Sequence, residues 1–572
     1  HLLSRRQRQM CIRDRYIMLL DRYLPRIEFN SYEDFKENYK VNIPENFNFG
    51  FDIVDEWAKK EPEKNALVWC NDHGEEKKFT FNDISKLSNR TANYFKSIGI
   101  KKGTVVMLIL RRRWEYWICA TALHKIGAIL IPGTLQLTKK DIVYRGNAAK
   151  VSVIVCLPDE FVINQVNAAQ SEIPSLKTKV IVERKIEGWE YFEERIAQFS
   201  DAFERPVGSE ANKWNDIMLV YFTSGTTGMP KMVQHNFAHP LGHIVTAKYW
   251  QQVQENKLHM SVSDSGWAKF GWGKIYGQWI CGAVIFAYDM DKFIPLNLLK
   301  KITEYKVTTF CAPPTMFRFM LQEDVKSFDL SSIKTCCIAG EPLNPQVFND
   351  WYALTGLKLR EGFGQTEGTV LIANFKWLEP SAGSTGKPSP LYDIRLINEN
   401  GEECRPNEEG TIVVNDVKSN PPVGLFTGYY HNEQMTDEAL YGDYYDTGDV
   451  AVRDENGYYW FMGRNDDVIK CSGYRIGPFE VESAILEHPA AVECAVTSAP
   501  DPIRGQVVKA TIVLARGFEP SEELTKEIQN HVKKVTAPYK YPRIVEYVSE
   551  LPKTIGGKIK RKEIRQKDNK MN

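Results

Sequence analysis

The run Tyr221–Lys231, YFTSGTTGMPK, combines hydroxyl groups, glycines and a lysine directly after an apolar segment. Glycines let backbone N–H groups converge on an anion, and hydroxyl groups add hydrogen-bond donors. The spacing differs from the G-x-x-x-x-G-K-[ST] loop, because Gly225 and Gly228 are three residues apart and Pro230 precedes the lysine. We therefore predict a phosphate-binding loop of another kind, with an ordinary glycine-rich turn as the alternative.

Four later segments also combine small, aromatic and charged residues. They are EGFGQTE (361–367), YDTGDV (445–450), GRNDDVIKCSGYRIGP (463–478) and LPKTIGGKIKR (551–561). Together with the first loop, and in this order, they resemble the motifs of the adenylate-forming enzymes, and of acyl-CoA synthetases in particular. The resemblance covers roughly residues 30 to 565. SGYRIGPFEVE combined with APYKYPR (537–543) is most similar to medium-chain acyl-CoA synthetases.

The resemblance implies a two-step reaction with ATP, Mg²⁺ and coenzyme A. A carboxylate attacks the α-phosphorus of ATP, pyrophosphate leaves, and the CoA thiol then displaces AMP from the acyl-adenylate. The first step brings an anion to a polyanion, and two unit charges about 4 Å apart interact by about 4 kcal/mol at an effective dielectric constant near 20. Such a site needs hydrogen-bond donors, a metal and lysine, but no protein nucleophile.

The resemblance also assigns residues to the nucleotide. The β- and γ-phosphates are expected to contact Thr223, Ser224, Gly225, Thr226, Thr227, Gly228 and Lys231. The second motif is expected to contribute Glu361, Gly362, Phe363, Gly364, Gln365, Thr366 and Glu367. Within it, Phe363 offers a face to adenine, Thr366 contacts the α-phosphate, and Glu367 supplies a hard oxygen ligand to Mg²⁺. Asp449 accepts from both ribose hydroxyls, and Arg464 adds a cation beside them.

Lys558 is implied by the resemblance as a catalytic residue, in addition to Thr366 and Glu367. It neutralises charge between the carboxylate and the α-phosphate, whereas the alternative is one more charge in a solvated tail. Asp466 corresponds to a hinge that swings the small domain, so that Lys558 leaves and Gly473 borders the channel for the thiol. The expected CoA contacts are Ser472, Gly473, Tyr474, Arg475, Arg504, Tyr541 and Arg543.

The acid pocket is expected around SDSGWAKFGWG (263–273). By resemblance Trp267 closes this pocket before the thiol arrives, and the alternative is a plain core tryptophan. Gly340 and Gly364 are small enough to leave room for an alkyl chain. A medium-length saturated acid is the leading expectation, followed by short branched or aromatic acids.

The elements that must position these residues alternate between two patterns. Continuous apolar runs occur at 104–110, 151–156, 216–222, 283–288, 307–312 and 333–340. Helical patterns separate them, which is typical of parallel sheets covered on both faces. After about residue 390, Asn-Gly turns between alternating segments indicate antiparallel hairpins and a β-barrel-like subdomain. From residue 479 the pattern indicates a small α+β domain.

These patterns predict an α/β protein with three parts. Residues 1–15 are interpreted as a non-native or disordered segment resembling translated sequencing adapter, with a transit peptide as the alternative. By the resemblance, residues 16–463 are expected to form a large adenylation domain, and residues 464–572 a small mobile domain beyond the hinge.

Composition narrows the partners. Lysine plus arginine and aspartate plus glutamate both number 73, so no net charge draws the chain to nucleic acid or membranes. Eleven cysteines without a CxxC pair favour a reducing compartment, and we predict a cytoplasmic protein. The longest apolar stretch, Trp117–Ile131, is interrupted by His124 and Lys125, which argues against a membrane span.

Three regularly spaced histidines form a candidate metal site. His235, His239 and His243 have the spacing of ligands on one helix face. Because Pro240 interrupts that face, we expect packing or surface roles instead. The oligomeric state is left open.

Three alternative functions are compatible with parts of this pattern. An aryl- or short-chain acyl-CoA ligase would share all of the chemistry. A freestanding adenylation enzyme would load a separate carrier protein instead of CoA. A catalytically idle nucleotide-binding protein would lack the charged residues that are intact here.

Overall fold

A computed structural model describes residues 19–223, 229–471, 474–501, 504–553 and 559–571, so the segment 1–15 lies outside the described residues. Its first large sheet has seven strands in the order β7-β6-β5-β3-β4-β8-β9, all parallel except for the hairpin of β8 and β9. The strands are β3 (Val105–Ile109), β4 (Ile129–Pro132), β5 (Val153–Cys156), β6 (Thr178–Ile181), β7 (Glu190–Tyr191), β8 (Ile217–Thr223) and β9 (Lys231–Asn236).

The second large sheet has nine strands in the order β16-β15-β14-β13-β12-β10-β11-β1-β2. Its five central pairings, from β14 to β1, are parallel. The strands are β1 (Asn65–Asn71), β2 (Glu76–Thr80), β10 (Leu258–Ser261), β11 (Val284–Asp289), β12 (Thr309–Ala312), β13 (Thr335–Ala339), β14 (Leu359–Phe363), β15 (Ile372–Ala373) and β16 (Lys387–Pro388). The apolar runs of the sequence therefore form parallel strands, as predicted.

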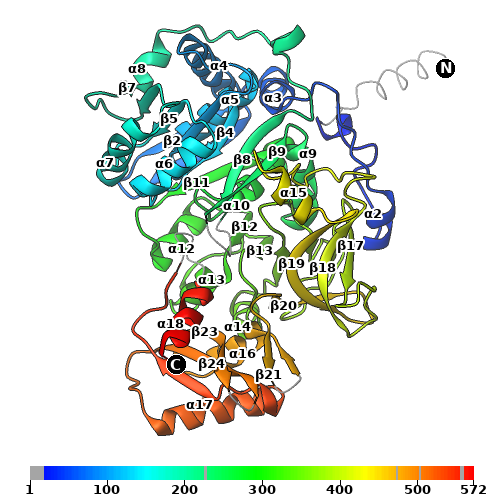
Figure 1. The fold of residues 1–572 in the computed structure, drawn as a ribbon. Helices are drawn as coiled ribbons and strands as arrows, with labels where there is room; N and C mark the ends of the chain where they lie inside the picture. The colour runs from blue at the N-terminus through cyan, green and yellow to red at the C-terminus, as the bar shows by residue number, and fades with distance from the viewer. Residues whose placement is uncertain (1–18, 224–228, 472–473, 502–503, 554–558, 572) are drawn as a thin grey trace, which may run out of the picture.

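Helices accompany both sheets (Figure 1). Those of the first 200 residues are α2 (Tyr32–Asn38), α3 (Glu56–Lys60), α4 (Phe81–Ser97), α5 (Glu115–Ile126), α6 (Lys139–Ala148), α7 (Glu160–Ala169) and α8 (Phe192–Ala197). The next are α9 (His239–Ile244), α10 (Ala268–Gly273), α11 (Tyr276–Ile280), α12 (Pro295–Glu304), α13 (Pro314–Met320) and α14 (Pro345–Thr355). A π-helix, η2 (Gly50–Asp55), precedes α3, and another, η5 (Val245–Trp250), continues α9.

The predicted hairpins form a four-stranded antiparallel sheet, β17-β18-β19-β20. Its strands are β17 (Asp393–Ile397), β18 (Glu409–Asn415), β19 (Tyr444–Arg453) and β20 (Tyr459–Arg464), and α15 (Glu433–Ala439) lies between β18 and β19 in the chain. The turn residues Asn456 and Gly457 connect β19 to β20, as their Asn-Gly sequence predicted.

The C-terminal part is a small α+β unit with its own core of apolar side chains. Its strands are β21 (Ile469–Cys471), β22 (Tyr474–Ile476), β23 (Ala491–Asp501), β24 (Gly505–Leu514) and β25 (Ile544–Tyr547). Its helices are α16 (Pro478–Leu486), α17 (Glu522–Val535) and α18 (Arg561–Met571). Figure 1 shows this unit at one end of the molecule, next to α14, and the Asn344 amide donates to the Ser483 carbonyl oxygen across the junction.

The apolar stretch Trp117–Ile131 divides between helix α5 and strand β4. Gly127 ends the helix with a φ of 81°, which a side chain would disfavour. Lys125 is buried, and its ammonium group binds Asp55 at 2.7 Å and Asn89 at 2.6 Å. This stretch is thus a core element, and none of the described helices is long and apolar enough to cross a membrane.

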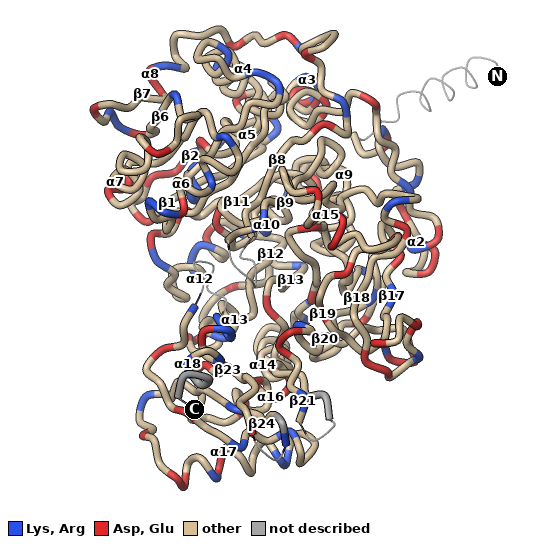
Figure 2. The backbone as a smooth tube through the Cα atoms, in the orientation of Figure 1, with Lys and Arg blue, Asp and Glu red and all other residues tan. Residues whose placement is uncertain are grey.

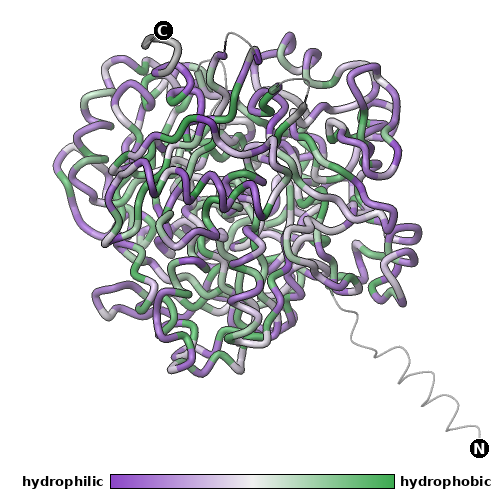
Figure 3. The backbone as a smooth tube through the Cα atoms, turned by 90° about the horizontal axis from the view of Figure 1, so that it is seen from below, coloured by the Kyte–Doolittle hydropathy of each residue, from purple (hydrophilic) through white to green (hydrophobic). Residues whose placement is uncertain are grey.

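Hydrophilic residues lie mainly toward the outside of the molecule, and charges of both signs are mixed along the chain. Figure 3 shows hydrophilic backbone mostly at the periphery, while Figure 2 shows lysine and arginine interspersed with aspartate and glutamate. The ten cysteines among the described residues are all buried free thiols.

Candidate active site

The predicted phosphate-binding loop follows β8. Thr223 pairs with Lys231 in the hairpin of β8 and β9, so the strands hold both ends of the loop together. The Lys231 ammonium group lies 5.1 Å from the centre of the Tyr429 ring. The predicted phosphate contacts Ser224, Gly225, Thr226, Thr227 and Gly228 lie outside the described residues.

Glu367 lies beside this lysine, after β14. Its Oε1 accepts from the Tyr429 hydroxyl at 3.1 Å, and its carbonyl oxygen accepts from the N–H of Phe426 at 2.6 Å. Burial raises the pKa of Glu367, whereas the Tyr429 hydroxyl and the Lys231 charge favour the ionised form. The arrangement places a carboxylate, held by the Tyr429 hydroxyl, near the Lys231 cation.

The backbone of Thr366 is held by a histidine of β9. Its carbonyl oxygen lies 2.8 Å from Nε2 of His235, whose pKa burial lowers to about 4. The histidine is therefore neutral near pH 7, and its Nε2–H donates to the carbonyl oxygen. The predicted α-phosphate contact and the predicted metal ligand thus share one anchored loop.

Asp449 is the centre of a second polar group, on β19. Its carboxylate accepts from the side-chain amide of Gln365, and Arg464 approaches its Oδ1 at 3.4 Å. The Tyr445 hydroxyl donates to Gln365 Oε1 at 2.6 Å, which orients the amide. Asp449 and Arg464 are opposite each other in the β19–β20 register. Gln365, predicted as a nucleotide contact, binds Asp449 here and so joins the second motif to the third.

The two glycines of the second motif are close to tryptophans. A Cβ on Gly362 would lie 2.5 Å from Trp250, and one on Gly364 would lie 2.3 Å from Trp272. The expectation that Gly364 leaves room for an alkyl chain was therefore wrong, because the indole of Trp272 occupies that space. Glycine is required there for close packing.

Two other residues of this motif lie on β14. Phe363 is partly exposed, with its ring centre 5.8 Å from that of Phe461. Glu361 is buried, and its Oε1 accepts from the Thr385 hydroxyl at 3.3 Å. Burial raises the pKa of Glu361 to about 8, so its carboxyl group is mostly protonated near pH 7.

The predicted acid pocket lies near α10. Trp267 precedes this helix and is partly exposed, so it is not a plain core residue. Gly340 follows β13 with a φ of 97°, and the space beside it opens toward Lys269, whose Nζ lies 3.6 Å from the position of a Cβ. The Lys269 ammonium group donates to the Ala339 carbonyl oxygen. Both predicted pocket residues thus lie near one helix.

The predicted CoA contacts lie in the C-terminal unit. The Arg543 guanidinium donates to the Tyr541 hydroxyl at 2.7 Å, and the N–H of Arg504 donates to Asp501 at 2.8 Å. Lys533, which the sequence analysis did not single out, lies 4.1 Å above the Tyr541 ring. A cationic and aromatic surface of this kind suits a nucleotide with phosphates.

Further predicted site residues lie wholly or partly outside the described part of the chain. Ser472, Gly473 and the catalytic candidate Lys558 lie outside the described residues. Tyr474 and Arg475 belong to β22, opposite Cys471 and Lys470, but their side chains are not described.

The three spaced histidines are buried, in keeping with a packing role. His235 is on β9, while Pro240 lies in the first turn of α9 and so starts the helix instead of interrupting it. His239 and His243 approach at 3.1 Å between their Nε2 atoms. Within the part of the chain that the structure describes, no group of three or more potential ligands could hold a metal ion.

Comparison with known proteins agrees with this geometry. Residues 54–430 match the AMP-binding enzyme family, and residues 480–558 match the AMP-binding enzyme C-terminal domain. The human mitochondrial acyl-coenzyme A synthetase ACSM3 is 43% identical over 550 residues, covering 94% of this chain and 93% of that protein. Human mitochondrial ACSM4 is 44% identical over 547 residues, with coverage of 94% and 93%.

A solved structure shows the same fold. The anthranilate CoA ligase AuaEII in complex with anthranoyl-AMP superposes with a TM-score of 0.84 at 28% identity, covering 92% of this chain and 98% of that one. The predicted α/β architecture with a small C-terminal domain is thereby confirmed. The chain belongs to the AMP-binding enzyme family of adenylate-forming proteins, as an AMP-forming acyl-CoA synthetase that uses a carboxylic acid, ATP and CoA.

Proposed function

We propose that this protein activates medium-chain fatty acids. The acid and ATP give an acyl-adenylate and pyrophosphate, and CoA then gives the acyl-CoA and AMP. The observation that carries the nucleotide assignment is the convergence of three motifs: Lys231 lies against Tyr429, Tyr429 binds Glu367, and Gln365 binds Asp449. The medium-chain assignment rests on the 472–482 and 537–543 segments and on the kinship with the ACSM synthetases.

Charge neutralisation is the main task of the protein in the first step. Thr223, Lys231 and the loop between them hold the leaving pyrophosphate, and Thr366 contacts the α-phosphate. Asp449 accepts from both ribose hydroxyls, while Arg464 offsets its charge. Lys558 enters from the small domain and stabilises the negative charge that develops between the acid and the phosphorus.

Glu367 is the proposed Mg²⁺ ligand. The residue suits this ion because it offers a hard carboxylate oxygen, while its other oxygen, Oε1, is engaged by Tyr429. Burial raises the pKa of Glu367, and the charge of Lys231 opposes that shift. When bound, Mg²⁺ supplies positive charge to the phosphate oxygens. The protein's own contribution is to hold that carboxylate in place through the hydrogen bond from Tyr429.

The second step requires the small domain to turn. We propose boundaries at 16–463 and 464–572, with Asp466 as the hinge. The separate core of the C-terminal unit supports this division, and so do the contacts of Arg565, which donates to Asp467 at 2.5 Å and to the Asp466 carbonyl oxygen at 3.4 Å. In the second pose Gly473 borders the thiol channel. Ser472, Tyr474, Arg475, Arg504, Tyr541 and Arg543 hold CoA.

The test is an assay of pyrophosphate and thioester across saturated, branched and aromatic acids, with and without CoA. We expect the highest kcat/KM for acids of medium length. A preference for aromatic acids would favour the alternative that the likeness to the anthranilate ligase supports. Pyrophosphate without thioester would favour loading of a carrier protein, and no pyrophosphate with any acid would favour an idle nucleotide-binding protein.

We also propose a cytosolic location. The buried free thiols suit a reducing compartment, whereas the named ACSM relatives are mitochondrial. Fractionation of the source cells, or expression of a tagged full-length chain, distinguishes the two.

A further inference from the structure

The loop before Trp267 lies close to two cationic side chains. Its residues Ser263–Gly266 connect β10 to α10. Lys274, just past α10, has 1% of its surface exposed. Arg112, just past β3, approaches the same loop; 13% of its side chain is exposed, and burial lowers the pKa of its guanidinium. Neither cation has a role in the chemistry above.

Both cations contact this loop. The Lys274 ammonium group donates to the Ser263 carbonyl oxygen at 3.3 Å, and Arg112 Nη1 lies 3.8 Å from Asp264 Oδ2. Asp264 in turn shapes the turn, because its Oδ1 accepts from the N–H of Gly266 at 3.1 Å and its carbonyl oxygen accepts from the N–H of Trp267 at 3.2 Å. The position of Trp267 thus depends on a carboxylate that two cations face.

The backbone next to Arg112 is adapted to the same loop. Arg111 has a φ of 50°, in the left-handed region that non-glycine residues rarely adopt. Its carbonyl oxygen accepts from the N–H of Ser265 at 3.2 Å, and its side chain is fixed by Asp289 at 2.7 Å. Backbone strain of this kind persists only where surrounding contacts hold it in place.

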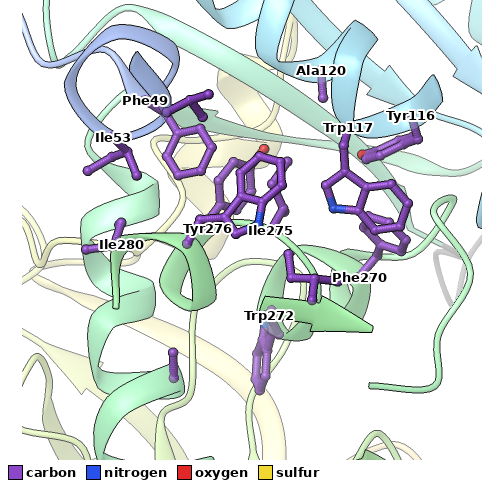
Figure 4. Close-up of a cluster of buried hydrophobic side chains, with 14 of the residues drawn as sticks. Phe49, Ile53, Tyr116, Trp117, Ala120, Phe270, Trp272, Ile275, Tyr276 and Ile280 are labelled. Atoms are coloured by element: carbon purple, nitrogen blue, oxygen red, sulfur yellow. The ribbon is translucent and has the colours of Figure 1, made fainter. Parts of the chain in front are cut away.

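The segment that follows this loop is held in place through α10. Figure 4 shows Phe270 next to Tyr116 and Trp117 of α5, and Trp272 directed elsewhere from the same helix. The indole N–H of Trp117 donates to the Lys274 carbonyl oxygen at 2.6 Å, so the backbone of Lys274 is anchored to α5. Burial, and then the charge of Arg112, lower the pKa of Lys274 to about 7, whereas Asp264 and Asp289 oppose this.

We propose that Lys274 and Arg112 are positioning residues that clamp the 263–266 loop, and through it set where Trp267 stands in the acid pocket. The inference rests on the proposed function, because it takes Trp267 as a wall of that pocket. It assigns acid selectivity partly to buried charges that do not touch the acid. The loop carries a network of four hydrogen bonds and one ion pair whose loss would let the tryptophan move.

The test compares Lys274→Met with Lys125→Met in the full-length protein. Lys125 is a matched control because it is also a buried lysine whose ammonium group donates to a backbone carbonyl oxygen, but its contacts are Asp55, Ser85 and Asn89. Hydrogen exchange of the peptide around 263–268 is measured first, since it needs no activity. We expect about tenfold faster exchange in Lys274→Met and no change there in Lys125→Met.

The second readout is selectivity between a medium-chain and a branched acid. We expect Lys274→Met to raise the KM for the preferred acid about tenfold and leave the KM for ATP within about twofold. Lys274→Gln, which keeps a donor for Ser263, should recover part of the loss. Asp264→Asn tests the same loop if the buried variants fail to fold, because 23% of its side chain is exposed.

The outcomes separate this inference from the proposed function. Unchanged exchange at 263–268 in Lys274→Met and Asp264→Asn overturns the clamp, whether or not the wild type is active. Faster exchange with an unchanged ratio of acid KM values overturns the link to selectivity. Failure of the wild type to release AMP with any acid would instead count against the proposed function.

Discussion

Asp449→Asn removes the charge that we assign to ribose binding and keeps the size of the side chain. In the wild type the carboxylate accepts from Gln365 and lies 3.4 Å from Arg464. An asparagine has one acceptor oxygen and one donor group, so its NH₂ must face either the Gln365 amide or the Arg464 cation. One existing contact is therefore lost in either orientation.

The expected size of the effect follows from the ribose contacts. Hydrogen bonds to an ionised acceptor contribute about 1.5–3 kcal/mol, roughly twice the contribution of neutral ones. If each of the two ribose hydrogen bonds loses about half of its contribution, the cost is about 2 kcal/mol, which corresponds to a roughly thirty-fold weaker affinity for ATP. The measurement is the Kd for ATP by calorimetry, together with the rate of ATP–pyrophosphate exchange.

The control is Asp393→Asn. This aspartate lies on β17 of the same sheet, with 42% of its side chain exposed and a 2.8 Å ion pair with Arg395. Because exposed pairs contribute little, we expect a change in Kd below about threefold. The reasoning is refuted if Asp449→Asn binds ATP as tightly as this control, with both proteins folded.

Three further predictions concern the two half-reactions and the pH profile. Lys558→Ala should abolish adenylation but leave thioester formation from supplied acyl-adenylate largely intact, and equal loss of both would contradict the swinging-domain assignment. Gly473→Leu should spare pyrophosphate release and block CoA use, as measured by parallel assays of the two products. Burial raises the pKa of Glu367, and the charge of Lys231 opposes that shift, so activity should be present above this pKa and be lost as pH falls through it. In Lys231→Met the pKa of Glu367 should rise further, so activity should be lost at a higher pH. An unmoved acid limb in pH profiles of AMP formation would argue against Glu367 as the ionised ligand.

The strands could be predicted from the sequence where they leave a local pattern of apolar residues. Continuous apolar runs such as 151–156 are strands with both faces covered, and such runs can be recognised in the sequence without knowing which strands they pair with. The register of β1 could not be predicted, because it inserts beside β11, more than 200 residues away in the chain. Long-range pairings leave no local signal.

The candidate site divides in the same way. Motif residues such as Lys231 and Asp449 were found from their types and order. Their supports, Tyr429 and Tyr445, are aromatic residues in segments without a period, and only the folded chain brings them to Glu367 and Gln365. Gly364 was misread because a glycine indicates missing volume but not which neighbour fills it.

The central claim is that the acid attacks the α-phosphorus of ATP in this site. The direct measurement uses a medium-chain acid with ¹⁸O in its carboxylate, together with ATP, Mg²⁺, CoA and the full-length enzyme. After attack, the CoA thiol breaks the bond between the acyl carbon and its bridging oxygen, so that oxygen stays on AMP. We predict one ¹⁸O atom in each AMP formed, as detected by mass spectrometry. Unlabelled AMP, or label in inorganic phosphate with ADP as the product, would contradict the account.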